Sequence, residues 1–452
     1  MKKATFLGLT ITPDSSDRWF WERGRVLVFV LLGFTAFNYI YNGLFRPLST
    51  EQVDFIAYYN AALAFRHGLP VYEHMIRFFE QGVVNYEGPF PYVYPPGFVL
   101  FLSPFAYVTF KQASLFWNLL NNVCFFFSLI LLMKTIKQHY SRLEWITLVF
   151  VSMNFTPLFL NYLVGQCNII LLFLITLGLH FYRSNRSICV GIVLALATTV
   201  KVIPGLLIGF MLWKRQYKAF LSAVLGLLLI LAYSLLFFDV DLHLWYFKFM
   251  AHQNLFDAYH DNHSVTGFFS RFLVHSVWGQ AVSHSPILSQ VCIVVTSALM
   301  LFVLLYVTRK GHNNSGERSL REYALVVVTM LLTSRMTSTP YLVMLLLPVA
   351  ILVHELFQKR VASRWMYPLA AAYGLIAIWY PLPVGKFLDM DVYRILMKGP
   401  QVHVFSLQFF ALLVFWAYFA FAPLPIGKDP AGHGAHGESR LPEGSEETLR
   451  AL

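Results

Sequence analysis

The chain has 452 residues, of which 57% are hydrophobic and only 13% are charged. A soluble domain usually carries about 25% charged residues, and a soluble core this apolar would leave large apolar surfaces in water. The composition therefore excludes a soluble globular protein and indicates a polytopic membrane protein. The net charge of +11 comes from short basic clusters between apolar runs. This is the pattern of the positive-inside rule, so nucleic acid is not an expected partner.

The first apolar run, residues 26–45, follows a polar N-terminal segment, residues 1–25. Three arginines directly precede the run, and basic residues are retained on the cytoplasmic side of a membrane helix. We therefore expect residues 1–25 to be cytoplasmic and residues 26–45 to form an uncleaved signal anchor. Basic clusters recur between the later apolar runs. Placing them on one side of a plasma (inner) membrane predicts about twelve crossings, with both termini in the cytoplasm.

Two polar segments are predicted on the outer face, residues 46–112 and 239–285. The first contains an apolar stretch, residues 97–110, which is short and interrupted by Ser103-Pro104. A stretch of this length does not cross the hydrocarbon layer comfortably, so we predict an interfacial helix. Residues 423–452 are rich in Gly, Pro and Glu, which predicts a disordered cytoplasmic tail.

The predicted fold class is an all-α polytopic integral membrane protein. Uninterrupted membrane helices are expected over residues 113–133, 144–163, 168–182, 219–238, 286–307, 365–381 and 404–422. Two other apolar stretches, residues 187–213 and 323–357, are each interrupted by a cation that a proline follows a few residues later. These cations are Lys201 and Arg335. A buried charge and a helix breaker disfavour one straight span. We predict two short helices in each stretch, with a single tilted helix as the alternative for residues 187–213.

A carboxylate begins the helix expected in the first outer segment. Asp54 precedes an apolar run that ends near Gly68, and at helical spacing it shares a face with Tyr58 and Ala62. The dipole of a helix keeps a carboxylate in its first turn ionised and able to accept a proton. The position therefore fits a general base, and it equally fits a simple N-terminal capping acid.

Further polar and aromatic residues lie at predicted membrane boundaries. Tyr92 and Tyr94 lie in a proline-rich stretch that fixes the backbone, and they are candidates to line a sugar or headgroup site. Lys201 at membrane depth is a candidate phosphate partner, although its side chain could extend to the outer surface instead. Gln166 and Asn168 begin a predicted helix, where they fit either helix capping or the lining of a polar pocket.

The second outer segment contains several His and Asp residues. Their spacing does not match a zinc site, and the four cysteines form no CxxC pair. No metal or cofactor is therefore predicted.

Motifs along the chain, taken in order, resemble those of glycosyltransferase family 87. The matching pieces are Asp54-Phe55 with Tyr58, Tyr94-Pro95-Pro96, Gly165-Gln166-Cys167-Asn168, Lys201-Val202-Ile203-Pro204, and Asn262-His263-Ser264-Val265-Thr266-Gly267 with Arg271. His263 stands where the family has Gln. The resemblance implies a GT-C fold in which residues 26–422 form one transmembrane catalytic domain. It also implies a mannosyltransferase that uses a polyprenyl-phosphate sugar donor.

By this resemblance Asp54 is the catalytic base. Tyr58, Asn262 and His263 become candidates for binding the substrates. The leaving lipid phosphate requires a cation, for which Lys201 and Arg271 are candidates and Arg335 is a further one. The expected reaction is inverting transfer of a hexose, mannose in particular, to a lipid-linked or glycan acceptor on the outer face. The alternatives are a transporter or flippase of polyprenyl-linked glycans and a glycan ligase with a polyprenyl-diphosphate donor.

Overall fold

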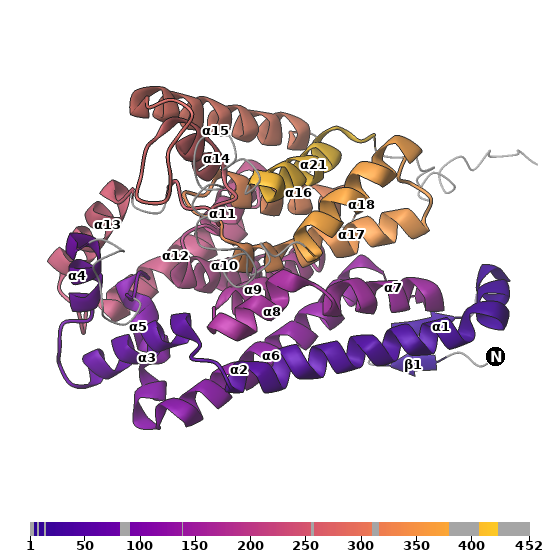
Figure 1. Cartoon of the computed structure of the whole chain (residues 1–452), viewed down its shortest axis with the longest axis horizontal. Coiled ribbons are helices and arrows are strands. Elements are labelled where there is room, and N and C mark those ends of the chain that lie inside the picture. Colours follow the sequence, from indigo (N-terminus) through magenta and orange to yellow (C-terminus); the bar gives the residue numbers. More distant parts are fainter. Residues whose placement is uncertain are drawn as a thin grey trace, which may run out of the picture. The chain divides into compact units, whose positions relative to one another are not determined.

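A computed structural model describes residues 4–6, 9–12, 15–81, 91–137, 139–254, 257–309, 316–378 and 406–423. The chain is mostly helical, as predicted (Figure 1). One small three-stranded sheet accompanies the helices. Its strands are β1 (Ala4–Phe6), β2 (Leu9–Thr12) and β3 (His139–Ser141), in the order β1-β2-β3. β1 is antiparallel to β2, and β2 is parallel to β3.

Five helical stretches are long and apolar enough to cross a membrane within the described residues, or six if a bent pair counts as one span. The first runs from Val26 to Leu48 through α1 (Ser15–Tyr39), the π-helix η1 (Ile40–Phe45) and α2 (Arg46–Leu48). The others are α6 (Phe110–Ile136), α12 (Tyr217–Ser234), α15 (Pro286–Thr308) and the pair η3 (Thr339–Leu345) with α17 (Leu346–Phe357). The chain is thus suited to span a bilayer several times, and the twelve crossings stay a prediction.

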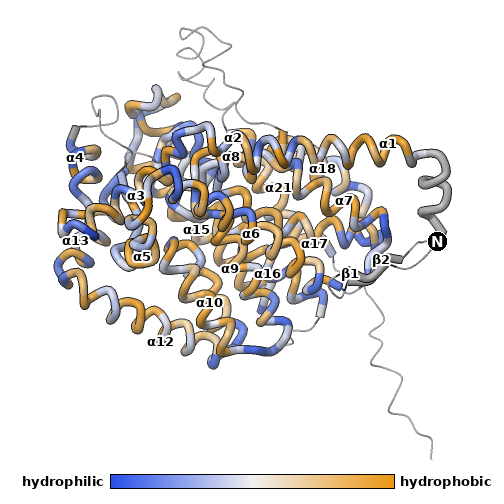
Figure 2. Tube along the Cα trace, turned by 90° about the horizontal axis from the view of Figure 1, so that it is seen from below, coloured by the Kyte–Doolittle hydropathy of each residue, from blue (hydrophilic) through white to orange (hydrophobic). Residues whose placement is uncertain are grey.

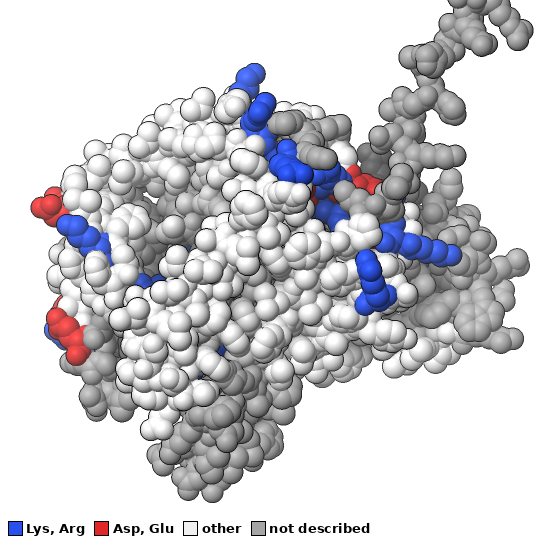
Figure 3. Space-filling view, turned by 90° about the horizontal axis from the view of Figure 1, so that it is seen from above, with Lys and Arg blue, Asp and Glu red and all other residues white. Residues whose placement is uncertain are grey.

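The surface supports this membrane assignment. Leucine, isoleucine and valine side chains project outward from α12 and α15, and Figure 2 shows hydrophobic residues along α6, α10 and α12. On the face drawn in Figure 3, charged side chains gather toward two sides, and the surface between them carries few. An uncharged zone between charged margins is what a protein surrounded by lipid requires, because charge is costly in hydrocarbon.

Both interrupted stretches are broken where the sequence predicts. α10 (Ser187–Val200) and α11 (Gly205–Trp213) are separate helices on either side of Lys201, so the single tilted helix is wrong. α16 (Glu317–Thr333) ends just before Arg335, and η3 follows.

The predicted uninterrupted helix over residues 144–163 is also wrong, since α7 (Arg142–Met153) and α8 (Thr156–Val164) meet at an angle of 41°. Pro157 in the first turn of α8 lacks the amide N–H that a continuous helix would need.

Three further predicted spans are present: the first nearly as predicted, and the other two shorter than predicted. They are α9 (Asn168–Arg183), α18 (Ser363–Ala377) and α21 (Leu407–Phe421). The central helix of the bundle is α16, whose side chains from Ser319 to Leu332 are buried on every side. From Tyr323 to Leu332 the helix is almost entirely apolar, as is typical of a helix in the interior of a large core. The predicted outer loop over residues 381–403 and the tail beyond residue 423 lie outside the described residues.

The two predicted outer segments meet at one end of the bundle. The first contains α3 (Val53–Arg66), α4 (Glu73–Gln81), α5 (Pro96–Leu102) and the 3₁₀ helix η2 (Ser103–Tyr107); the second contains α13 (Val240–His252) and α14 (Val265–Leu273). Figures 1 and 2 both show α3, α4, α5 and α13 at the same end. Tyr246 Oη donates to the Val93 carbonyl at 3.0 Å, which joins the segments. α5 and η2 are together too short for a full span, and their interfacial position stays a prediction.

Candidate active site

Asp54 lies in the first turn of α3. The residue at the N-cap is Gln52, in the left-handed conformation with φ 46°, and the helix has no side-chain cap. The interpretation of Asp54 as a simple capping acid is therefore not supported. The residue as a whole is intermediate in exposure, and its carboxylate does not cap the helix.

A tight turn brings the start of α9 against the start of α3. α8 ends at Gly165, whose φ of +73° favours glycine. A Cβ at this position would lie 2.6 Å from Phe55 Cβ, so only glycine permits the contact with α3. Trp117 Nε1 donates to the Gly165 carbonyl at 2.8 Å and holds the turn. The turn therefore presents Gln166 to Asp54.

Gln166 connects Asp54 with three other candidate residues. Its Oε1 accepts hydrogen bonds from Tyr94 Oη at 3.0 Å, Tyr58 Oη at 3.2 Å and Lys201 Nζ at 3.3 Å. Tyr58 Oη also donates to Tyr94 Oη at 2.7 Å. A polar contact from the Gln166 side chain also favours the ionised form of Asp54. Because the amide oxygen is an acceptor, its NH₂ group remains to donate to the carboxylate.

Lys201 lies in the gap between α10 and α11, and its side chain is only 6% exposed. Its Nζ donates to Asn168 Oδ1 at 2.7 Å and lies 3.4 Å from the centre of the Tyr341 ring. The N-cap residue of α9 is Cys167, and no side chain caps this helix. Gln166 and Asn168 instead contact Lys201, and their role in lining a polar pocket stays a prediction. The ammonium group points into the molecule, so the alternative of an outward-extended lysine is wrong.

The environment adjusts the basicity of the Asp54 carboxylate. Desolvation by burial raises the pKa of Asp54 to about 6, and the hydrogen bond with Gln166 and the charge of Lys201 limit the rise. A base with a pKa near the working pH is deprotonated at neutral pH and still holds a proton firmly enough to take it from a hydroxyl.

Asn262 and His263 lie in a second cluster, at the break between α16 and η3. Asn262 Nδ2 donates to the Arg335 carbonyl at 3.0 Å, and His263 N donates to the Thr337 carbonyl at 2.7 Å. His263 Nε2 lies 3.0 Å from both Asp261 Oδ1 and Thr339 Oγ1. Burial opposes ionisation of Asp261, but the hydrogen bonds and charge of His263 outweigh it and lower the pKa of that carboxyl.

The two predicted arginines make structural contacts away from Lys201. Arg271 is buried, and its guanidinium donates to the carbonyls of Tyr259 at 2.8 Å and Asn262 at 2.6 Å. Desolvation lowers its pKa to about 10. Arg335 pairs with Asp257 through both terminal oxygens, at 2.8 and 3.1 Å. Both arginines hold the second outer segment in place, and their predicted contact with a lipid phosphate stays a prediction.

Two residues near the site were not among the candidates drawn from sequence. Tyr341 places its ring against Lys201, and its position directly after Pro340 in a broken hairpin was the available signal. Gln52 fixes the start of α3 through an unusual backbone conformation, which no sequence pattern indicates. Tyr92, a predicted residue, packs beside Tyr94 with ring centres 5.6 Å apart and lines a cavity next to the site. The described residues contain no group of three or more His, Cys, Asp or Glu placed to hold a metal ion.

Comparison with known proteins bears on this arrangement. The sequence model of glycosyltransferase family 87 matches residues 92–335, which is more than half of the chain. The chain belongs to glycosyltransferase family 87. The matched part of this family 87 member includes Tyr94, Gln166 and Lys201, whereas Asp54 lies before it. Family membership makes the chain a glycosyltransferase, and the transporter alternative is set aside.

Two curated relatives are named alpha-(1->3)-arabinofuranosyltransferase and come from two strains of Mycobacterium tuberculosis, CDC 1551 / Oshkosh and ATCC 25618 / H37Rv. Each is 28% identical to this family 87 member over 176 residues, which is 38% of this chain and 38% of the relative. The chain thus matches well under half the length of these relatives. No solved structure matches it.

Proposed function

We propose that this chain transfers a sugar from a polyprenyl-phosphate donor to a lipid-linked or glycan acceptor, with inversion and with Asp54 as the general base. The observation that carries the proposal is the coupling of Asp54 to Lys201 through Gln166. A proton acceptor and a cation on opposite sides of one amide suit a reaction that removes a proton from one substrate and releases an anion from the other.

In the proposed reaction the acceptor hydroxyl oxygen attacks the anomeric carbon of the donor sugar. The bond between that carbon and the phosphate oxygen breaks, and Asp54 takes the hydroxyl proton. The products are a glycoside and a polyprenyl phosphate. A carboxylate within hydrogen-bond reach of the hydroxyl makes the oxygen a stronger nucleophile as the new bond forms.

The leaving phosphate needs positive charge and hydrogen-bond donors, since it departs as an anion. Lys201 supplies an ammonium group, and no described carboxylate forms a salt bridge with it. Asn168 supports the same role. Its Nδ2 is buried and has no hydrogen-bond partner among the described residues, so it is available to donate to a phosphate oxygen. A buried donor without a partner is costly, and a bound phosphate oxygen would supply that partner.

We place the outer segments and Asp54 on the outer face of the plasma membrane, with both termini in the cytoplasm and about twelve crossings. In this placement the lipid tail of the donor lies in the bilayer beside the helices. A donor carried on a lipid is the reason for a sugar transferase to be built inside a membrane.

The sugar is proposed to be a hexose, mannose in particular. The name of the curated relatives adds arabinofuranose as a second candidate. The decisive assay supplies purified protein with polyprenyl-phosphate mannose or polyprenyl-phosphate arabinofuranose, together with a membrane lipid extract as acceptor. We expect one donor to yield a new glycolipid by mass spectrometry. Product from a nucleotide sugar alone, with none from either lipid donor, would contradict the proposed donor class.

The activity of the protein is expected to depend on pH through Asp54. Burial raises the pKa of Asp54 to about 6, and only the deprotonated carboxylate can accept the hydroxyl proton. We expect kcat/KM to fall about tenfold per pH unit below that value and to level off above it. The measurement is kcat/KM for the acceptor, at saturating donor, over pH values on both sides of this pKa. A profile without a rising limb around pH 6 would argue against Asp54 as the base.

A further inference from the structure

Two cavities lie on either side of the segment that joins α3 to α4. The polar cavity has a volume of about 240 Å³ and is lined by Asn60, His67, Glu73, His74 and Tyr92, together with small residues of α3. The apolar cavity has a volume of about 340 Å³ and is lined mainly by Phe65, Ile76, Phe237, Phe238, Leu242 and Trp245. Both are also lined by Leu69, Pro70, Val71 and Glu73, so they share one wall.

The polar cavity runs along α3 and begins one helical turn beyond the predicted base. Three alanines of its lining, Ala57, Ala61 and Ala64, recur at the helical spacing that begins with Asp54. Asp54 itself is not part of the lining, and the cavity begins one turn away, about 5 Å along the helix. Small side chains on this face keep the cavity open one helical turn from Asp54.

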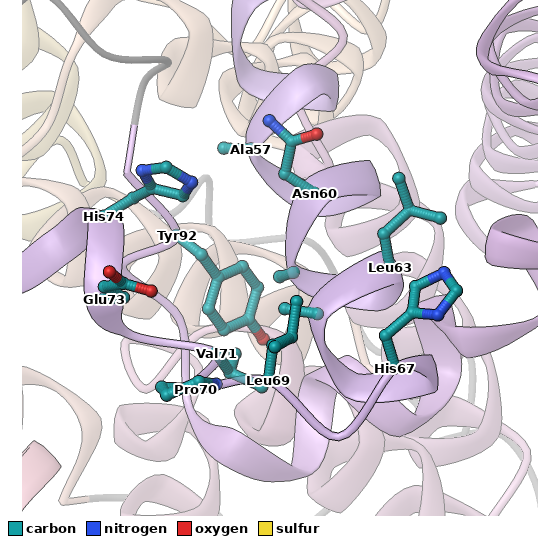
Figure 4. A pocket seen from close by; sticks show the side chains of 12 residues that line it. Ala57, Asn60, Leu63, His67, Leu69, Pro70, Val71, Glu73, His74 and Tyr92 are labelled. Carbon is teal, nitrogen blue, oxygen red and sulfur yellow. The ribbon is translucent and has the colours of Figure 1, made fainter.

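The polar cavity has the chemistry of a site for uncharged sugar. Figure 4 shows the Tyr92 ring in the middle, with His74 and Glu73 on one side, His67 on the other and Asn60 above. Amide, imidazole and carboxylate groups exchange hydrogen bonds with hydroxyls, and an aromatic ring offers an apolar face for a sugar ring. The described lining includes no Lys or Arg, and Glu73 adds a carboxylate that is paired with Arg77 outside the cavity. An anionic phosphate therefore does not suit it.

The apolar cavity lies where a lipid chain would leave the bilayer. Phe237 and Phe238 follow directly after α12, one of the membrane-spanning helices. Trp245 on α13 stacks on Phe249, with ring centres 5.0 Å apart, and tryptophan is typical of the membrane interface. A single glycolipid could place its hydrocarbon chain in the apolar cavity and its sugar in the polar cavity, because the two cavities share a wall.

We infer that these two cavities form the acceptor site and that the acceptor is a glycolipid. Its uncharged sugar occupies the polar cavity beside Asp54, and its hydrocarbon chain occupies the apolar cavity. The inference rests on the proposed transferase function and deepens it, because it selects a lipid-linked acceptor over a free glycan. The donor phosphate is held elsewhere, at Lys201.

The test compares pairs of synthetic acceptors, each sugar being made as a methyl glycoside and as a hexadecyl glycoside. We expect the hexadecyl member to have a KM at least about tenfold lower, because its chain is buried in the apolar cavity. Trp245→Ala and Phe237→Ala should raise the KM of the hexadecyl glycoside about tenfold and leave that of the methyl glycoside unchanged. Asn60→Ala and His74→Ala should raise both values about fivefold. Leu236→Ala, which alters an exposed neighbour outside the lining, is the matched control.

A binding measurement separates this inference from the proposed chemistry. Asp54→Asn protein is irradiated with a hexadecyl glycoside that carries a diazirine in its chain, and labelled residues are mapped by mass spectrometry. Labels on the apolar cavity support the inference even when no product forms with any donor. Labels confined to other helices would overturn it. Trp245→Ala could instead raise the KM of the donor and leave that of the acceptor unchanged. This result would also overturn the inference, because it would assign the apolar cavity to the donor lipid.

Discussion

Asp54→Asn is expected to lower kcat by about a thousandfold, with little change in the KM of the donor. The substitution keeps the size of the side chain and its capacity to bond with Gln166, but it removes the group that accepts the hydroxyl proton. Turnover is measured with purified protein and the active lipid donor found above. The loss should persist at every pH, because an amide does not become a base when the pH rises.

The matched control for Asp54 is Glu51→Gln. Glu51 is an exposed carboxylate three residues earlier in the same segment, and its loss should leave kcat within about twofold of the native value, as expected for a surface residue. Asp54→Asn protein that elutes and melts as the native protein does, and that still turns over at the native rate, would remove Asp54 from the mechanism.

Lys201→Met is expected to lower kcat/KM for the lipid donor by about a hundredfold or more. Methionine matches the apolar stem of lysine, so the packing around Tyr341 is largely kept while the ammonium group is lost. Without that charge neither the bound phosphate nor the departing one is stabilised. Lys201→Arg retains the charge and should recover part of the activity, although the planar guanidinium matches the position of Nζ imperfectly.

A purely structural role for Lys201 makes different predictions. Its hydrogen bonds to Gln166 and Asn168 stabilise the turn before α9, so their loss alone would lower the melting temperature. In the proposed role, binding of polyprenyl phosphate to Lys201→Met is weakened even where the protein is folded. Lys111→Met, at an exposed lysine on α6, is the control. Native affinity for polyprenyl phosphate in folded Lys201→Met protein would refute a phosphate contact.

The sequence alone was enough to predict the features that depend on residues close together in the chain. Hydropathy predicted the membrane helices, and a cation before a proline predicted the helix breaks at Lys201 and Arg335. The αL turn at Gly165 follows from a local rule as well, since glycine commonly ends a helix. The bend between α7 and α8 was missed although Pro157 was visible, because a proline in an apolar run is compatible with either a kinked span or two helices.

The different surroundings of Arg335 and Lys201 could not be predicted from the sequence. The sequence presents it as the counterpart of Lys201, since each interrupts an apolar hairpin. In the structure Arg335 pairs with Asp257, whereas Lys201 faces Gln166, Asn168 and an aromatic ring. Whether a cation is neutralised within the protein or left for a ligand depends on which side chains the fold brings to it.

By itself, the sequence determined that the chain needs a bilayer, that two apolar stretches break at Lys201 and Arg335, and that Asp54 begins a helix. Only the tertiary structure decided that Gln166 contacts Lys201 and lies beside Asp54, and that a cavity begins one helical turn beyond Asp54. The reason is that hydropathy and turn propensity act over a few residues, whereas Gln166 meets Tyr58 across 108 positions and Lys201 across 35. Such contacts arise from the packing of whole helices, here from a glycine turn pressed against α3, and packing is set by all the surfaces in contact together.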